Sequence, residues 1–287
     1  MWFVMESAQT SYELSERLIR TISNLRTFST ANDDVEQLLD AGADVNGLHG
    51  TLLPLQCACM VNDQYCIQLL LERGALVNAV DGYGRTALHY AAERDECCAE
   101  ALIQNGANVN ACDGNNNTPL HWAAYKNNVE CVKMLLQAGA RVDAVDYNLD
   151  TPLSWAARRG NLEVIQILLN YNADASHRNA KGHTPLMRAA SIVASGLETA
   201  VDDACLQLLI RASGQFDARN NSGELVSELA RDNKVRETLM PLCTNPLQLS
   251  GLCRARIRRC LGTCYMPNVV PKLPIPQQMH RFVLLYR

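Results

Sequence analysis

The sequence predicts an all-α protein in which a solenoid of helix-turn-helix repeats with short β-hairpin loops is followed by a small helical module. Two observations predict the solenoid: a seven-residue motif recurs with a spacing of about 33 residues, and an apolar pair with a Gly-Ala turn follows most copies. A third predicts the module, because both patterns stop after residue 243. We therefore divide the chain into an N-terminal capping helix and tail (1–32), about five repeats with degenerate ends (33–235) and a C-terminal module (236–287).

The N-terminal segment has the periodicity of a helix with one apolar face. Within residues 12–26 this face carries Leu14, Leu18, Ile19, Ile22 and Leu25. Residues 35–39 and the turn at 42–46 then resemble the second half of a repeat whose first half is missing. We expect the N-terminal helix to cover this open end of the stack.

The repeat motif begins Thr-Pro-Leu-His and continues with a pair of alanines. It occupies residues 86–92, 118–124, 151–157 and 184–190, with small substitutions, and residues 53–59 keep its frame without the Thr and His. Thr can cap a helix that Pro begins, and Leu with the two alanines forms a narrow apolar face. A second helix follows each copy and ends in Gly-Ala, or in Asn172-Ala173 in one repeat. These features resemble the ankyrin repeat.

The end of the repeat region departs from the period. The apolar pair Leu209-Ile210 lies eight residues further from its two alanines than the equivalent pair does in the third copy, so we expect an insertion near residues 192–203. It is either a tolerated lengthened loop or helix, or an element that contacts a partner. A degenerate block from Asn220 to about Asn233 is expected to close the stack.

Composition excludes several classes of protein. The net charge of -4 argues against binding to nucleic acid, and no stretch is apolar and long enough for a secretory signal or a membrane span. We therefore expect a cytoplasmic protein that does not bind membranes. Among the twelve cysteines, Cys66, Cys98 and Cys131 each precede a Gly-Ala turn by eight residues, which indicates a structural role for a reduced thiol. Zinc-ligand spacing is absent, so we expect no metal and no cofactor.

No catalytic motif is present in the sequence, and we expect a protein that is not an enzyme. His89 and His121 occupy the His of the repeat motif, where the residue braces neighbouring backbone. Trp122 and Trp155 share one helix position and are better explained as packing residues than as a stacking platform.

The resemblance to ankyrin repeats implies that loop tips and the exposed ends of the first helices bind a partner. This surface is rich in Tyr and Arg, which are enriched at binding hot spots. The candidate partner-binding residues are Tyr83, Arg85, Asn115, Asn117, Tyr125, Tyr147, Arg158 and Arg159.

A helix is well specified between Asn245, a suitable N-cap, and Gly262, a suitable end. Its apolar stripe consists of Leu249, Leu252, Cys253, Ile257 and Leu261, and the opposite, polar face carries Arg254 and Arg258. The spacing Leu-x-x-x-Cys-x-x-x-aliphatic resembles the BC box of SOCS boxes, here at about 246–261, and implies that these residues bind elongin C. Gln248 and Gly251 depart from the pattern. The alternative is that the arginines of 254–259 form a basic patch, which their regular helical spacing disfavours.

A second short motif follows at about residues 271–279. Leu273, Pro274, Ile275 and Pro276, with Met279 where Leu is usual, resemble the cullin box. The resemblance implies that the first four residues bind a cullin. Prolines suit such a segment, because they restrict the backbone and so reduce the conformational entropy lost when it becomes ordered.

Together, the repeats and the two boxes resemble the ankyrin repeat and SOCS box family. This resemblance implies a substrate-recognition subunit that binds elongin B and C, then cullin-5 with its RING subunit, and presents an unknown protein substrate for ubiquitination and degradation. The alternative is an ankyrin scaffold or inhibitor that has no ligase role.

Overall fold

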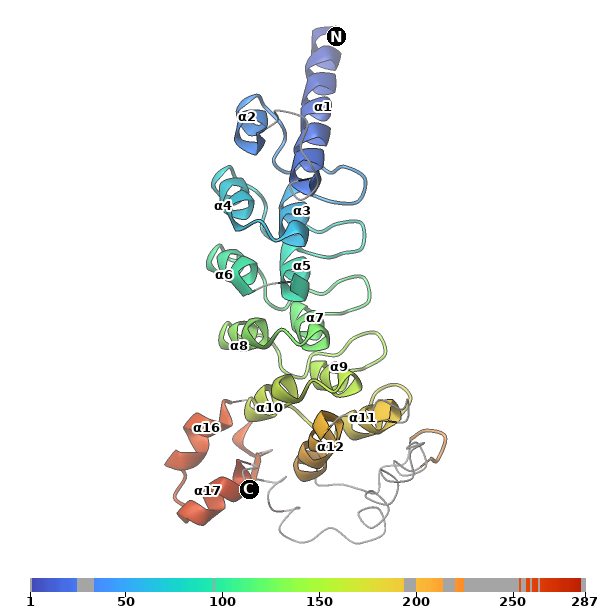
Figure 1. Cartoon of the computed structure of the whole chain (residues 1–287), viewed down its shortest axis with the longest axis vertical. Coiled ribbons are helices and arrows are strands. Elements are labelled where there is room, and N and C mark those ends of the chain that lie inside the picture. Colours follow the sequence, from blue (N-terminus) through green and yellow to red (C-terminus); the bar gives the residue numbers. More distant parts are fainter. Residues whose placement is uncertain are drawn as a thin grey trace. The chain divides into compact units, whose positions relative to one another are not determined.

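The computed structural model describes residues 2–24, 34–94, 96–193, 200–213, 220–224, 253, 257–258, 260–262 and 264–284 (Figure 1). These residues form helices and turns without a β strand, apart from one isolated bridge between His49 and Leu52. The all-α fold predicted from the sequence is confirmed. The chain divides into two compact units, residues 1–122 with 137–139, and residues 123–136 with 140–287. Helices α7 (Pro119–Lys126) and α8 (Val129–Gln137) cross the boundary.

The first unit stacks first helices on first helices and second helices on second helices. α1 packs on α2 and α3, α3 packs on α5, and α4 packs on α6 (Figure 1). The buried face of α1 includes Leu18, Ile19 and Ile22, as the periodicity predicted. The helices are α1 (Trp2–Asn24), α2 (Val35–Asp40), α3 (Pro54–Val61), α4 (Gln64–Glu72), α5 (Ala87–Arg94) and α6 (Glu96–Gln104).

His89, the His of one repeat motif, links the start of its helix to the following loop. The Nδ1 atom of His89 accepts the backbone N–H of Thr86 (3.0 Å), so the proton is on Nε2, which donates to the carbonyl of Asn117 (3.0 Å). Gln56 replaces His in the first copy and makes equivalent bonds. Its Oε1 accepts the N–H of Leu53 (2.9 Å), and its Nε2 donates to the carbonyl of Arg85 (2.9 Å).

Each loop tip is a tight turn built around one acidic or amide side chain. Asp81 accepts the backbone N–H groups of Tyr83 (2.7 Å) and Arg85 (2.8 Å) through Oδ1, and its own N–H donates to the Arg85 carbonyl (2.9 Å). The same pattern recurs at Asp113, Asp146, Asn179 and Asn220. A second backbone bond closes each turn, such as the one from the Gly84 N–H to the Asp81 carbonyl (3.0 Å). Within the described residues, the expected β-hairpin loops extend no further than these tips.

The second unit contains α9 (Pro152–Arg159), α10 (Leu162–Asn170), α11 (Pro185–Val193) and α12 (Ala200–Ser213). As the motif predicted, the Thr151 hydroxyl caps α9 by accepting the N–H of Ser154 (3.3 Å). α12 has 14 residues where α10 has 9, so part of the predicted insertion lengthens this helix. Residues 194–199 of the insertion and most of the closing block lie outside the described residues.

The C-terminal module has a small core of its own within the second unit. Met266, Val270, Val283 and Leu284 are buried together. They come from α16 (Met266–Val269), the 3-10 helix η1 (Val270–Lys272), α17 (Gln277–Val283) and the residue that follows it. Gly262 has φ +69°, the left-handed conformation expected of a glycine that ends a helix.

Cysteine burial follows the repeat. Cys66, Cys98 and Cys131 are all buried, and every cysteine that the structure describes is a free thiol, as predicted. Burial raises the pKa of the Cys66 thiol to about 12, so this group stays protonated and unreactive. Within the described residues, no helix combines the length and apolar character needed to cross a membrane.

The link from helix start to following loop should respond to substitution of His89. His89→Ala leaves the Thr86 N–H and the Asn117 carbonyl without their partner and should cost about 1–3 kcal/mol of unfolding free energy. His89→Gln should recover most of this loss, because Gln56 already makes both kinds of bond in this fold. Urea denaturation followed by circular dichroism measures the difference, and equal losses in the two variants would contradict the role assigned to the ring nitrogens.

The same histidine should make stability depend on pH. Burial lowers the pKa of His89, so the ring is neutral in the folded chain and protonates more readily after unfolding. The contribution is complete above the unfolded pKa of about 6.5 and is lost as the pH falls through the lower folded value. Between pH 7.5 and pH 5.5, the wild type should therefore lose more stability than His89→Gln does.

Candidate partner-binding surfaces

The four candidate residues of the first unit divide into exposed and buried ones. Tyr83 is 64% exposed at a loop tip, and Asn115 is exposed at the next tip. Asn117 is only 5% exposed, and its amide donates to Oδ2 of Asp113 (3.0 Å). Its carbonyl accepts His89, as described above. Asn117 therefore braces the loop and does not belong to the exposed surface on which the sequence placed it.

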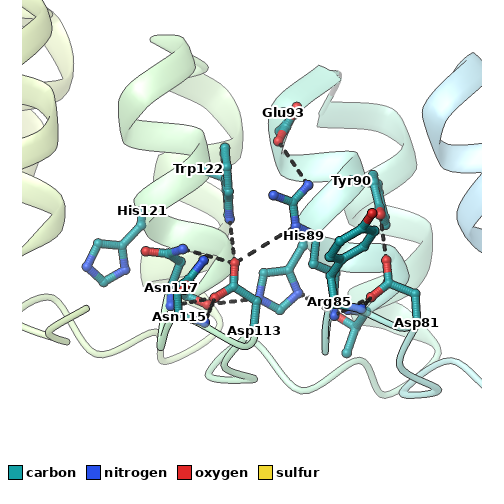
Figure 2. Close-up of polar contacts among 12 residues, drawn as sticks. Asp81, Arg85, His89, Tyr90, Glu93, Asp113, Asn115, Asn117, His121 and Trp122 are labelled. Atoms are coloured by element: carbon teal, nitrogen blue, oxygen red, sulfur yellow. Dashed lines mark hydrogen bonds and ion pairs between the residues drawn. The ribbon is translucent and has the colours of Figure 1, made fainter. Parts of the chain in front are cut away.

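Arg85 lies between the aromatic rings of Tyr90 and Trp122 (Figure 2). Its guanidinium carbon is 4.5 Å from the centre of the Trp122 ring and 5.6 Å from that of Tyr90. Glu93 and Asp113 lie within 3.8 and 3.9 Å of its nitrogens. Cation-π contacts and two carboxylates hold the guanidinium in place, so a partner would meet an ordered arginine whose charge is already balanced.

The aromatic residues of the first helices also support the loop carboxylates (Figure 2). The Tyr90 hydroxyl donates to Oδ2 of Asp81 (2.6 Å), and the Trp122 indole donates to Oδ2 of Asp113 (3.4 Å). Burial by itself raises the pKa of Asp113, but hydrogen bonds from Asn117 and from the Asn115 and Asn117 backbone lower it below its ordinary value. The carboxylate is therefore charged and holds the turn. Trp122 has the structural role that the sequence favoured, with an added polar contact.

The candidate residues of the second unit are also tyrosines and arginines. Tyr147 is 80% exposed at its loop tip, and Arg158 and Arg159 are exposed at the end of α9. The guanidinium carbon of Arg159 lies 4.9 Å from the centre of the Tyr125 ring. That ring packs edge-on against Trp155 at 5.7 Å. All four candidate residues of this unit therefore have exposed or partly exposed side chains.

Trp155 repeats in the second unit the contact made by Trp122 in the first. Its indole donates to Oδ2 of Asp146 (3.1 Å), the acidic residue of the loop before it. The contact supports the assignment of Trp155 as a packing residue and adds a hydrogen bond that helix periodicity does not reveal.

Three of the five candidate elongin C-binding residues are described. Cys253 is exposed on a helical residue, whereas Ile257 and Leu261 are partly buried against the core of the C-terminal module. Leu249 and Leu252 lie outside the described residues. The predicted apolar stripe is therefore divided. Cys253 faces solvent, whereas Ile257 and Leu261 pack against the core of the module.

The candidate cullin-binding segment alternates between inward and outward residues. Leu273 and Ile275 pack against the core of the module, and Pro274 and Pro276 are exposed. Leu273 is extended, with φ -73° and ψ 142°. Gln277 already begins α17, so the extended stretch is shorter than the sequence predicted, because a proline is compatible with the start of a helix.

Arg258 was expected on the polar face of its helix, and this expectation is wrong. The side chain is buried, with 6% of the residue exposed, and its guanidinium donates to the carbonyls of Val283 (2.8 Å) and Leu169. Helix periodicity could not reveal this, because Leu169 lies 89 residues earlier in the chain.

The fold and these two kinds of surface define a class: a repeat protein of stacked helix pairs that carries a separate C-terminal helical module. Comparison with family models supports both parts. Ankyrin repeats (3 copies) match residues 28–113, 58–146 and 142–220, and SOCS box matches residues 245–284.

Known proteins show the same order of parts. The chain is 61% identical to Ankyrin repeat and SOCS box protein 8 of Homo sapiens and of Mus musculus, over 99% of this chain and 98% of each relative. It is also 34% identical over 80 residues to Ankyrin repeat and SOCS box protein 11 of Pongo abelii, 28% of this chain and 24% of that relative. The chain therefore belongs to the ankyrin repeat and SOCS box family.

Two tyrosines of the first unit should separate structural from surface roles. Tyr90→Phe removes the hydroxyl that donates to buried Asp81 and should lower the unfolding free energy by about 1–3 kcal/mol. Tyr83→Phe is the matched control, because this side chain is exposed, and it should change stability by less than about 0.5 kcal/mol. Thermal and urea unfolding measure both. A loss at Tyr83 as large as that at Tyr90 would refute this division.

Proposed function

We propose that this protein is the substrate-recognition subunit of a SOCS-box ubiquitin ligase containing elongin B, elongin C, cullin-5 and a RING subunit. The repeats would hold a target protein, and the box would hold the elongins and the cullin. In this proposal the chain performs no chemistry itself. It raises the effective concentration of target lysines near a charged E2, which is sufficient to accelerate ubiquitin transfer.

The proposal keeps the division of the chain made from its sequence. Residues 33–235 form the target-binding repeats behind the capping segment 1–32, and residues 236–287 form the box. The family models agree closely with these two regions. The repeat matches span residues 28–220 and so begin a few residues before the proposed boundary at 33, and the box match spans residues 245–284. The membership of the chain in the ankyrin repeat and SOCS box family supports the same assignment.

One observation carries the proposed elongin contact. The C-terminal module buries Met266, Val270, Val283 and Leu284 in its own core, while Cys253 on the BC-box helix stays exposed. Because Cys253 is not buried in the core of the module, its side chain is available to enter a groove on a partner. In this mode of binding a few apolar side chains provide most of the affinity. Leu249 and Leu252 are proposed as the other anchors of this surface, with Ile257 and Leu261 partly shared with the core.

The cullin contact is proposed for the segment after η1. Pro274 and Pro276 are exposed there, and their neighbours Leu273 and Ile275 are tied to the module core. This alternation holds the prolines in a defined position, which lowers the conformational entropy lost on binding. A cullin would then recognise a surface that the core of the module has already ordered.

The target is proposed to contact the exposed and partly exposed candidate residues of the two units. These are Tyr83, Arg85 and Asn115 in the first unit, and Tyr125, Tyr147, Arg158 and Arg159 in the second. Tyr and Arg provide large contact areas and several donors, and the cation-π contacts of Arg85 and Arg159 restrict their side chains before binding.

Loss of two anchors should remove elongin C. Leu249→Ala with Cys253→Ala removes two apolar side chains at about 2 kcal/mol each, which should weaken binding roughly a thousandfold. Copurification from cells and titration with purified elongin B/C measure this loss. Cys112→Ala is the control, because it changes an exposed cysteine in a repeat loop. Wild-type capture of elongin C by the double variant would refute the box assignment.

Changes in the second box should act on the cullin alone. Pro274→Ala with Pro276→Ala frees the backbone of the exposed segment and should weaken cullin-5 binding about tenfold while elongin binding stays unchanged. Pro267→Ala, at a partly exposed proline of the same module outside residues 271–279, is the control. Titration of cullin-5 into the preformed elongin complex gives the answer, and equal affinity for the wild type and the double variant would count against the cullin box.

The anchor variant also separates a ligase subunit from a plain ankyrin scaffold. A ligase subunit without its anchors should retain its target and no longer promote the target's ubiquitination. A scaffold should act as before. Affinity capture with the wild type and with Leu249→Ala, Cys253→Ala, compared by mass spectrometry with and without proteasome inhibition, distinguishes the two functions.

A further inference from the structure

The repeat that contains α10 ends differently from the four repeats before it. Two residues after α2, α4, α6 and α8 the chain turns through a left-handed glycine, with φ between +83° and +97°, at Gly42, Gly74, Gly106 and Gly139. After α10 the same place holds Asn172, with φ +63°. Asparagine tolerates this conformation less well than glycine does, so its presence calls for a compensating interaction.

The compensating interaction is with the C-terminal module. The Asn172 side-chain amide donates to the carbonyls of Arg258 (2.9 Å) and Gly262. Both carbonyls belong to the C-terminal part of the BC-box segment, where Gly262 turns the chain out of its helix with φ +69°. A glycine at this position could not make either bond, because it has no side chain.

Arg258 makes the reciprocal contact. Its guanidinium donates to the carbonyl of Leu169, in the last turn of α10, and to that of Val283 within the module. A cation at the C-terminal end of a helix is favourable because it meets the negative end of the helix dipole. Tyr171 and Tyr265 pack beside these bonds with ring centres 4.9 Å apart. Two helix ends therefore cap each other.

We propose that Asn172 and Arg258 are positioning residues that dock the C-terminal box on the end of α10. This contact fixes the direction in which the box faces relative to the repeat surface of the same unit. The functional consequence rests on the proposed ligase role: the contact would define where the E2 lies with respect to a target held by Tyr125, Tyr147 and Arg159. Loss of the contact would leave both binding surfaces intact and change their mutual orientation.

Asn172→Gly is the informative substitution. It restores the residue that four other repeats use, so the cap of α10 should be as good or better, while both amide bonds to the box are lost. Hydrogen-deuterium exchange of the full chain should show amides of α16 and α17 exchanging roughly tenfold faster, with α9 and α10 unchanged. Asn172→Asp should have at least as large an effect, because a carboxylate would face two carbonyl oxygens.

Gly139→Asn is the matched control. It places asparagine at the same cap position of the preceding repeat, where the backbone carbonyl is bonded to Asn110. It should leave exchange in α16 and α17 as in the wild type. If Asn172→Gly also leaves this exchange unchanged, Asn172 is a helix cap only and the docking proposal is overturned.

Two further measurements test the consequence for function. Elongin B/C capture by Asn172→Gly should equal that of the wild type, because the Leu249 and Cys253 anchors are untouched. In a reconstituted ubiquitination reaction, the ratio of modification among the chain's own lysines should shift by about threefold or more, as expected when orientation changes without loss of binding. An unchanged ratio despite faster exchange would overturn the positioning role. Failure of the wild type to capture elongins would instead refute the ligase function and leave the exchange result standing.

Discussion

The fold depends on one shared requirement: backbone groups at the helix starts and in the loops must find partners, and those of a loop can come from the neighbouring repeat. His89 satisfies the N–H at its own helix start and a carbonyl of the following loop, and Gln56 does the same one repeat earlier. A buried N–H or C=O without a partner costs about 1–3 kcal/mol. A repeat is therefore completed only by the next one, which explains why such units are stable as stacks and not singly.

This bracing also orders the loops of the proposed partner-binding surface. The loop carboxylates Asp81, Asp113 and Asp146 each hold two backbone N–H groups, and an aromatic residue of the following helix holds the second carboxylate oxygen. The loops that present Tyr83 and Tyr147 are consequently ordered before any partner arrives. The entropy lost on binding is then confined mainly to exposed side chains, and ordered loops with Tyr and Arg at their tips suit recognition of a protein surface.

The second unit combines a repeat surface with a module that has its own small core. Arg258 and Asn172 join them through hydrogen bonds to backbone carbonyls at two helix ends. Such a contact is polar and directional, and it specifies orientation more than a purely apolar contact would. This property suits the proposed role, in which the repeats would hold a target and the box would hold ligase subunits.

The sequence by itself determined the helices, the repeat period, the glycine-terminated turns and the family, because each follows from residues close together in the chain. Capping, apolar periodicity and buried cysteines were all predictable in this way. Tertiary structure alone decided the roles of Asn117 and Arg258, which look like surface residues in their local patterns and are buried by partners 28 and 89 residues away. Helix periodicity reports which face of a helix is apolar, but it does not say which distant carbonyl a polar side chain will reach.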